Sequence, residues 1–428
     1  MHSNTHITIT FSRGWVVTFA AAGLGVVFGI LYVWSVIKSG IPIGWEWSNA
    51  EKAMPYSTMA ITFSIIMVPA GQLQDRYGPR LGVMLGGFLA GLGCIIAGLS
   101  GSSLLAYIIG VGVITGAGVG FGYSALTPSA LKWFPPEKTG LVAGIVVAGS
   151  GLAPVPMAPL TAWLLNYFAV TNSSGVVELG VSATMIVLGC VIWFVVGCLV
   201  WFIYNPPVTF IPLSRRTMDS GVKPCDFTSK EMLKTVQFWL LYFMYYSGAS
   251  AGLVFIGVAA DLGKQALGQW AFLVVVVLSL GNTLGRILVG FISDKIGREL
   301  ALFAEFTCQA LVVSVLYILS RQGDIALTMI MAVVFMIGLN YGSNLTIFPA
   351  TCRDYFGMKR FGLNYGCLFT AFGMAGLSMP LLNGLIRDLT GKQDLSYLLI
   401  VALLVISSML ALVSHYLGPP SVKTISKG

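Results

Sequence analysis

The chain has 428 residues, and its 24 Lys and Arg plus 16 Asp and Glu make up only 9% of them, against about 25% in an ordinary soluble domain. Hydrophobic residues account for 56%, and 51 residues are glycine. A soluble fold could not bury so much apolar surface and still cover itself with polar groups, which excludes a soluble enzyme, a nucleic-acid-binding protein and a disordered chain. The apolar runs are unbroken, unlike the alternating pattern of a transmembrane barrel. The composition therefore predicts an all-α membrane protein.

Twelve apolar segments are long enough to cross about 30 Å of hydrocarbon. In chain order they cover approximately residues 14–37, 55–73, 81–99, 104–130, 140–168, 179–204, 238–261, 269–292, 300–320, 325–349, 362–386 and 395–417. The longest polar connection lies between the sixth and seventh segments. We therefore predict twelve transmembrane helices in two bundles of six, over residues 1–205 and 238–428, joined by a cytoplasmic linker over residues 206–237.

The distribution of lysine and arginine predicts the orientation, because these residues are enriched in cytoplasmic segments. With the N-terminus inside, 17 of the 24 cations fall in cytoplasmic segments and 6 in external ones. Both termini are therefore expected in the cytoplasm. The remaining cation, Arg286, lies inside the eighth segment.

The two halves of the chain repeat each other. Asp75 and Gly78, after the second segment, correspond to Asp294 and Gly297, after the eighth, and both pairs are 219 residues apart. A second set shares an offset of 222 residues and pairs Trp133, Phe134, Gly140, Gly144 and Gly151 with Tyr355, Phe356, Gly362, Gly366 and Gly373. A parallel duplication of six spans is the architecture of transporters that rock two bundles around a site at mid-membrane.

The loop after the second segment has the pattern G-x-L-x-D-R-x-G-x-R over residues 71–80. It resembles the signature loop of the major facilitator superfamily, and the resemblance implies two pseudo-symmetric bundles of six helices. It also implies a charge relay between helix ends on the cytoplasmic face. By position, the relay residues are Asp75, Arg76, Arg80, Asp294 and Arg298.

A narrower resemblance covers nearly the whole chain. Residues 133–144 and 148–152 resemble the segment that leads into the fifth helix of the monocarboxylate transporters and oxalate/formate antiporters, and Arg13-Gly14-Trp15 resembles a reduced form of the motif that opens their first helix. Residues 226–239 resemble the family's approach to its seventh helix, and Arg286 stands where the family has its substrate arginine. The resemblance implies a bacterial carrier of L-lactate.

Arg286 is also a candidate site residue on physical grounds. It precedes Asp294 by eight residues, which places it about 12 Å inside the membrane, where a cation needs a cavity or a partner. A guanidinium stays charged and presents a fork that matches two carboxylate oxygens. The alternative is a structural ion pair, for which Glu305 is the candidate acid and Asp261 lies too far along its helix.

The rest of the eighth segment supports a polar site in the second half. Ser279, Asn282 and Arg286 are spaced as one helix stripe, and Gly281 and Gly285 favour close helix contact. Other polar candidates at a similar depth are Tyr32, Tyr123, Tyr341, Asn340 and Asn344. We expect Tyr341 and Tyr123 to donate hydrogen bonds to the carboxylate or hydroxyl of the substrate, and apolar residues from the first and fifth helices to line the site.

Two departures from the resembled family bear on the substrate. The oxalate antiporter has a lysine on its eleventh helix where this chain has Phe372, so a single cation favours a monocarboxylate over a dianion. Animal monocarboxylate transporters have an acid four residues before the arginine, where this chain has Asn282, and a lysine within the first helix, where the nearest here is Lys38 at its outer end. Proton symport is implied by the resemblance, but Glu305, Asp261 and the substrate itself all stay open as the proton carrier.

These features predict a secondary active transporter of small monocarboxylates such as L-lactate or pyruvate, working by alternating access, as a monomer, in a bacterial inner membrane. The alternatives are an exchanger of the oxalate/formate type, a drug exporter, which would not need Arg286, and a carboxylate sensor that does not transport. We expect no enzyme, because no nucleophile–base pair is found within the spans. Seven cysteines without a Cys-x-x-Cys pair and three histidines near the chain ends predict neither a metal site nor a cofactor.

Overall fold

The computed structural model describes residues 2–134, 139–171, 177–207, 227–321, 327–357 and 360–420. Within these ranges it describes all side chains except those of residues 2–12, 75, 139–141, 143, 260–266, 294, 361 and 362. Three candidate residues therefore have side chains that the structure does not describe: Asp75, Asp261 and Asp294.

The first half of the chain is almost entirely helical. Its long elements are α1 (His2–Phe28), α3 (Asn49–Tyr77), α4 (Pro79–Leu99), α6 (Gly116–Leu131), α7 (Thr139–Gly151), α8 (Pro154–Tyr167) and α9 (Val181–Leu199). Short pieces extend or connect them: η1 (Gly29–Val33), α2 (Trp34–Ser39), η2 (Ile43–Trp45), α5 (Leu104–Tyr107), the π-helical η3 (Ile108–Thr115) and η5 (Val200–Phe202). The two-residue strands β1 (Val170–Thr171) and β2 (Val177–Glu178) pair antiparallel and were not predicted from the sequence.

The second half consists of six long helices. They are α11 (Val236–Leu267), α12 (Phe272–Ile296), α13 (Arg298–Ser320), α14 (Leu327–Phe356), α15 (Phe361–Thr390) and α16 (Asp394–Leu417). The one-turn α10 (Ser229–Met232) precedes them, and η6 (Gly268–Trp270) connects α11 to α12. α10 falls inside the stretch predicted to be a linker.

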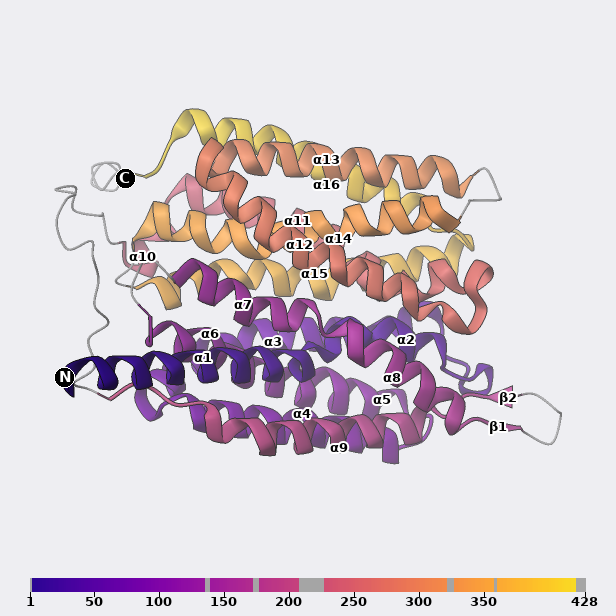
Figure 1. Ribbon diagram of the computed structural model, residues 1–428. Coiled ribbons are helices and arrows are strands. Elements are labelled where there is room, and N and C mark those ends of the chain that lie inside the picture. Colours follow the sequence, from indigo (N-terminus) through magenta and orange to yellow (C-terminus); the bar gives the residue numbers. More distant parts are fainter. Residues whose placement is uncertain are drawn as a thin grey trace.

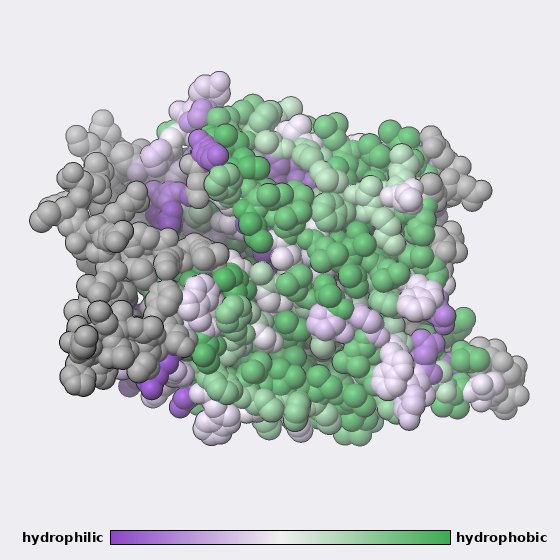
Figure 2. Space-filling model, viewed as in Figure 1, coloured by the Kyte–Doolittle hydropathy of each residue, from purple (hydrophilic) through white to green (hydrophobic). Residues whose placement is uncertain are grey.

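The described residues contain twelve helices that are long and apolar enough to cross a membrane, which confirms the predicted all-α fold with twelve spans. The first span runs through α1, η1 and α2, and the fifth through α7 and α8. Figure 2 shows the corresponding surface, where hydrophobic side chains cover the middle of the molecule and hydrophilic ones gather toward its two ends.

The helices of the first half lie on one side of the molecule and α11–α16 on the other, with their long axes roughly parallel (Figure 1). The start of α1 and the end of α16 lie at the same end, which we call the terminal end, and β1 and β2 lie at the opposite, far end (Figure 1). Between the halves, α3 packs along α15, α12 packs against α7 and α8, and α11 packs against α2.

The sequence repeat corresponds to a repeated turn. Gly78 separates α3 from α4 with φ 87°, and Gly297 separates α12 from α13 with φ 93°. Positive φ values are strained for residues with a Cβ atom, so both turns need glycine. The repeated sequence therefore folds into the same helix–turn–helix connection in each half.

Candidate functional site

Arg286 lies in the interior of α12, ten residues before its last residue, Ile296, or about 15 Å along the helix. Only 5% of Arg286 is exposed. The ion pairs among the described side chains do not include it, so the alternative of a structural pair between Arg286 and Glu305 is wrong. The site thus holds a buried cation that has no described anionic partner.

The guanidinium of Arg286 is instead held by neutral groups of the first half. Nη1 donates to the backbone oxygen of Val147 and to Oγ of Ser150 at 3.2 Å, both on α7. Nη2 donates to the hydroxyl of Tyr32 at 3.3 Å. Nε has no hydrogen-bond partner. Arg286 of the second half therefore bridges to the first half. On the edge formed by Nε and Nη2, hydrogen-bond donors are still available for another acceptor.

A break between α7 and α8 shapes this contact. Pro154 cannot donate a backbone hydrogen bond, and the N–H of Val155 turns to the oxygen of Leu152 at 2.9 Å. The carbonyl of Gly151 consequently has no helical donor and accepts a hydrogen bond from Oγ of Ser279 on α12. The proline break in the fifth span thus exposes the backbone oxygen of Gly151 to the second half.

Gly151 also allows α12 to come close. A Cβ atom at this position would lie 2.8 Å from Oγ1 of Thr283 and 3.3 Å from Nη1 of Arg286. Thr283, not Asn282, therefore faces α7 together with Ser279 and Arg286. Spacings of three and four residues both return to the same side of a helix, so periodicity did not separate Asn282 from Thr283, and the packing against Gly151 shows that Thr283 makes the contact with α7.

Asn282 packs toward α14 instead. A Cβ atom on Gly342 of α14 would lie 2.9 Å from Oδ1 of Asn282, and both amide atoms of this buried side chain have no hydrogen-bond partner. A Cβ atom on Gly285 would overlap the backbone oxygen of Leu339. The predicted close contact through Gly281 and Gly285 is therefore confirmed as the packing of α12 against α14, while the binding role of Asn282 stays a prediction.

Three predicted tyrosines lie around Arg286. The rings of Tyr32 and Tyr341 meet edge to face with centroids 6.4 Å apart, and the buried hydroxyl of Tyr341 has no hydrogen-bond partner. Tyr123 and Tyr341 both lie close enough to Arg286 to interact with it electrostatically. The structure therefore gathers these three hydroxyls near one guanidinium, from the first span, α6 and α14.

An aromatic cluster connects the halves beside these tyrosines. It contains Phe63 of α3, Tyr123 of α6, Tyr245 of α11, and Phe369 and Phe372 of α15. Phe369 and Phe372 stack with centroids 4.9 Å apart, and Phe63 meets Phe372 edge to face at 6.3 Å. Tyr123 meets Phe63 in the same way at 5.6 Å. The predicted site residue Phe372 thus belongs to an apolar wall and not to a polar one.

Asn344 lies deeper in the second half. Its Nδ2 donates to the backbone oxygen of Asn340 at 3.1 Å, and its side chain packs against Gly248 of α11 and interacts with Glu305 of α13. The structure does not bring Asn344 into hydrogen-bond contact with Arg286, so its predicted contact with substrate stays a prediction.

The arginines of the repeated loops tie helix ends together at the terminal end. Arg80 donates to the backbone oxygens of Ile203 and Trp201, each at 2.9 Å. Arg298 pairs with Asp354 of α14 at 3.1 Å. Each arginine therefore fastens the start of its helix to a different segment of its own half.

The remaining residues of the predicted relay are Arg76, Asp75 and Asp294. The guanidinium of the exposed Arg76 lies 5.3 Å from the ring centroid of Tyr77. Because the side chains of Asp75 and Asp294 are not described, the relay between acids and arginines stays a prediction.

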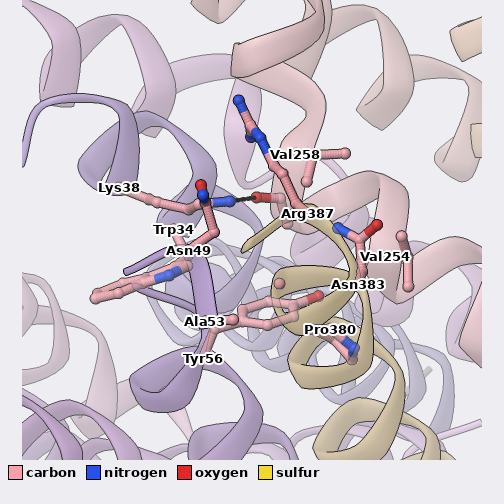
Figure 3. A pocket seen from close by; sticks show the side chains of 12 residues that line it. Trp34, Lys38, Asn49, Ala53, Tyr56, Val254, Val258, Pro380, Asn383 and Arg387 are labelled. Atoms are coloured by element: carbon pink, nitrogen blue, oxygen red, sulfur yellow. Dashed lines mark hydrogen bonds between the residues drawn. The ribbon is translucent and has the colours of Figure 1, made fainter. Parts of the chain in front are cut away.

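A small pocket between the halves lies near the end of α2, the start of α3 and the end of α15 (Figure 3). It is lined by Lys38 and Asn49 of the first half and by Asn383 and Arg387 of α15. Nζ of Lys38 donates to the backbone oxygen of Gly257 at 3.5 Å. Lys38 thus lies in the last turn of the first span and not in its interior, and its predicted external position stays a prediction.

Sequence reasoning missed Val147, Ser150 and Thr283 as neighbours of Arg286. The available signal was the proline pair at 154 and 156, which predicts bending but not which carbonyls it exposes. Nor does the described part of the chain bring together three or more His, Cys, Asp or Glu side chains able to hold a metal ion.

Comparison with known proteins agrees with this architecture. The Major Facilitator Superfamily sequence model matches residues 7–366. The chain is 27% identical to the oxalate:formate antiporter of Oxalobacter formigenes, over 86% of this chain and 83% of the antiporter. It is 25% identical to monocarboxylate transporter 13 of Bos taurus, over 92% and 88% of the two chains. It is also 25% identical to an uncharacterized MFS-type transporter, YhjX, of Escherichia coli, over 82% of each chain. The chain therefore belongs to the major facilitator superfamily, with the monocarboxylate transporters and the oxalate:formate antiporter among its relatives.

Proposed function

We propose that this membrane transporter carries small monocarboxylates such as L-lactate or pyruvate by alternating access, coupled to protons. The observation that carries the proposal is the buried Arg286, which has no described anionic partner and an unused Nε. A buried cation of this kind is stabilised by an anion that binds beside it.

The geometry of the guanidinium suggests how a carboxylate binds. Nη1 donates its hydrogen bonds to α7, whereas Nε has no hydrogen-bond partner and Nη2 donates to the hydroxyl of Tyr32. A carboxylate bound to Nε and Nη2 forms two parallel charge-assisted hydrogen bonds. The unpartnered hydroxyl of Tyr341 then serves as a further donor, and the aromatic cluster contacts the short carbon chain.

The same contacts couple binding to movement. Arg286 and Ser279 belong to the second half, but their hydrogen bonds go to α7 and Tyr32 of the first half. A bound carboxylate competes with these neutral acceptors and neutralises the cation. Carboxylate binding therefore changes the free-energy difference between conformations in which the two halves are in contact near Arg286 and those in which they are separated there. A ligand that stabilises one conformation more than the other shifts the equilibrium between them.

A single positive charge in the site sets the expected substrate charge. Phe372 occupies the position of the second cation in the resembled oxalate antiporter, and it stacks on Phe369 within an apolar wall. A dianion would leave one carboxylate without a counter-charge there, at a substantial desolvation cost. A monocarboxylate with a small apolar group can pair its charge with Arg286 and place its apolar group against the aromatic cluster.

We place the terminal end in the cytoplasm of a bacterium, with the protein in the inner membrane, because cations are enriched in the segments assigned to that side. The six-helix bundles of residues 1–205 and 238–428 are the moving units, and residues 206–237 connect them. We propose that a monomer is sufficient and that the protein is not an enzyme.

A carboxylate exchanger is the second candidate, favoured by the similarity to the oxalate:formate antiporter. It requires the same Arg286 but no proton. A sensor that binds carboxylates without transporting them would show binding and no uptake.

The test is uptake of labelled L-lactate into proteoliposomes, with and without an inward proton gradient. Arg286→Lys and Arg286→Ala should each slow uptake by about 10- to 100-fold, since loss of a charged hydrogen bond costs about 1.5–3 kcal/mol and lysine lacks the fork. Arg321→Lys is the matched control, because Arg321 is exposed at the end of α13. Normal lactate uptake by the Arg286 variants would refute the proposal, and uptake driven only by internal lactate would indicate exchange.

A further inference from the structure

Glu305 is a second buried ionisable side chain of the second half. It lies on α13, seven residues after that helix begins at Arg298, or about 10 Å along its axis. Only 5% of it is exposed, and neither carboxyl oxygen has a hydrogen-bond partner. This side chain is therefore almost completely withdrawn from water.

The surroundings of Glu305 are polar but uncharged. Gln309, one turn further along α13, is fully buried, and both its amide atoms lack partners. Asn344 of α14 interacts with Glu305, while its Nδ2 is used by the backbone oxygen of Asn340 and its Oδ1 is unpartnered. Glu305 thus belongs to a buried polar cluster with Gln309, its neighbour one turn along the same helix, and Asn344 of α14.

Among the described side chains, no charged group on the helices packed against α13 forms an ion pair with Glu305. α13 packs against α12, α14 and α16, whose described ionisable side chains at comparable depth are Arg286 on α12 and Tyr341 on α14. The side chain that interacts with Glu305 is Asn344, and neither Arg286 nor Tyr341 does so. An ionised carboxylate would therefore be buried without a counter-charge, which is strongly unfavourable at membrane depth.

The unsatisfied atoms fit a carboxylic acid. An ionised carboxylate only accepts hydrogen bonds, whereas a protonated one has an O–H group to donate. Nε2 of Gln309, one turn further along α13, has no partner and needs an acceptor. A protonated Glu305 carries no charge to be compensated, and its carbonyl oxygen can still accept a hydrogen bond from a neighbouring amide.

We infer that Glu305 is the residue that carries the coupled proton, an inference that rests on the proposed function. Protonation converts the carboxylate to a neutral acid that the buried cluster with Asn344 and Gln309 accommodates. Loss of the proton leaves a charge that must be hydrated, so α13 and α14 must move apart or admit water. The second half therefore has one arrangement when Glu305 is protonated and another when it is ionised.

The connection to the substrate site runs along α14. Asn344 lies three residues after Tyr341 on this helix, and Tyr341 contacts Tyr32, which accepts a hydrogen bond from Arg286. Both α14 side chains pack on glycines of α11, Asn344 on Gly248 and Tyr341 on Gly252. A shift of α14 at Asn344 therefore also moves the hydroxyl that faces the substrate site.

The experiment compares Glu305→Gln with the wild type in proteoliposomes. When one proton moves with each substrate, an inward gradient of one pH unit drives about tenfold accumulation of labelled L-lactate. Glutamine mimics the protonated acid, so the variant should accumulate none while still exchanging internal for external lactate. Glu305→Asp keeps a carboxyl group and should keep accumulation. Glu299→Gln, the same change on α13 nearer the terminal end, is the control that should accumulate lactate like the wild type.

The outcomes separate this inference from the proposed function. Tenfold accumulation by Glu305→Gln would overturn the inference, and so would loss of both exchange and accumulation, which would make Glu305 a structural residue. A wild type that exchanges lactate but does not accumulate it would also overturn the inference, while transport itself stands. Absence of any lactate movement in the wild type would instead refute the proposed function.

Discussion

Asp388 of α15 accepts hydrogen bonds from both the backbone N–H and the side-chain amide of Asn49, at 2.9 and 2.8 Å. Its other carboxylate oxygen accepts the backbone N–H of Ala50 at 2.9 Å. Asn49 and Ala50 form the first turn of α3, whose exposed N–H groups favour an anion. A carboxylate of the second half therefore caps a helix of the first half at the far end, beside the pocket of Figure 3.

Replacing Asp388 should loosen the far end. Asp388→Ala removes three hydrogen bonds between the halves, so states open at this end should become more populated. A cysteine introduced at Ala53, in the pocket wall, should react several-fold faster with a membrane-impermeant thiol reagent in a background without native cysteines. Asp394→Asn is the control, because Asp394 forms only an exposed pair with Arg321 at 3.8 Å. Unchanged labelling in Asp388→Ala would show that this cap does not hold the far end closed.

Tyr32→Phe tests the polar neighbours of Arg286. The change removes the hydroxyl 3.3 Å from Nη2 and keeps the ring that contacts Tyr341. A net hydrogen bond contributes about 1 kcal/mol, so we expect the KM for lactate uptake to rise about fivefold. The measurement is initial uptake against lactate concentration. Tyr317→Phe, at the far end of α13, should leave KM unchanged, and an equal KM in Tyr32→Phe would remove this hydroxyl from the binding site.

Gly151→Ala tests the contact between α7 and α12. The new methyl group would lie 2.8 Å from Thr283 and 3.3 Å from Arg286, so α12 must move away or the guanidinium must turn. Overpacking of this kind costs about 1–3 kcal/mol, and we expect slower uptake and a lower thermal unfolding temperature.

Gly144→Ala is the matched control for that variant. It lies on the same helix, and its Cβ atom would meet nothing within 4 Å. Both variants should be compared by uptake rate and by thermal unfolding in detergent. Equal behaviour of the two would mean that α7 and α12 do not need this close approach.

Local sequence features predicted the architecture well. The twelve spans follow from apolar length alone, because every backbone polar group in a membrane must be satisfied within its own helix. The repeat was equally readable, since Gly78 and Gly297 both need a positive φ that other residues adopt with strain. Arg286 stood out because a cation within an apolar run is expensive.

The side chains that these residues contact on other helices could not be predicted from the sequence. Sequence spacing placed Asn282 in the stripe with Arg286, but the packing of α12 on α7 selected Thr283 and turned Asn282 toward Gly342. Asn344 was expected at the substrate and lies beside Glu305. α14 packs against four helices, and periodicity does not say which face of α14 meets which of them.

The sequence by itself thus determined the class of protein, the number of spans, the repeat and the presence of a cation, Arg286, within a span, since all of these depend on residues within a single helix or turn. Only the tertiary structure decided that Arg286 bridges to backbone and hydroxyl oxygens of the first half, that Asn344 lies beside Glu305, and that Asp388 caps α3. Each of these contacts joins different helices. Their geometry is set by how helix faces pack across the two halves, which no local pattern specifies.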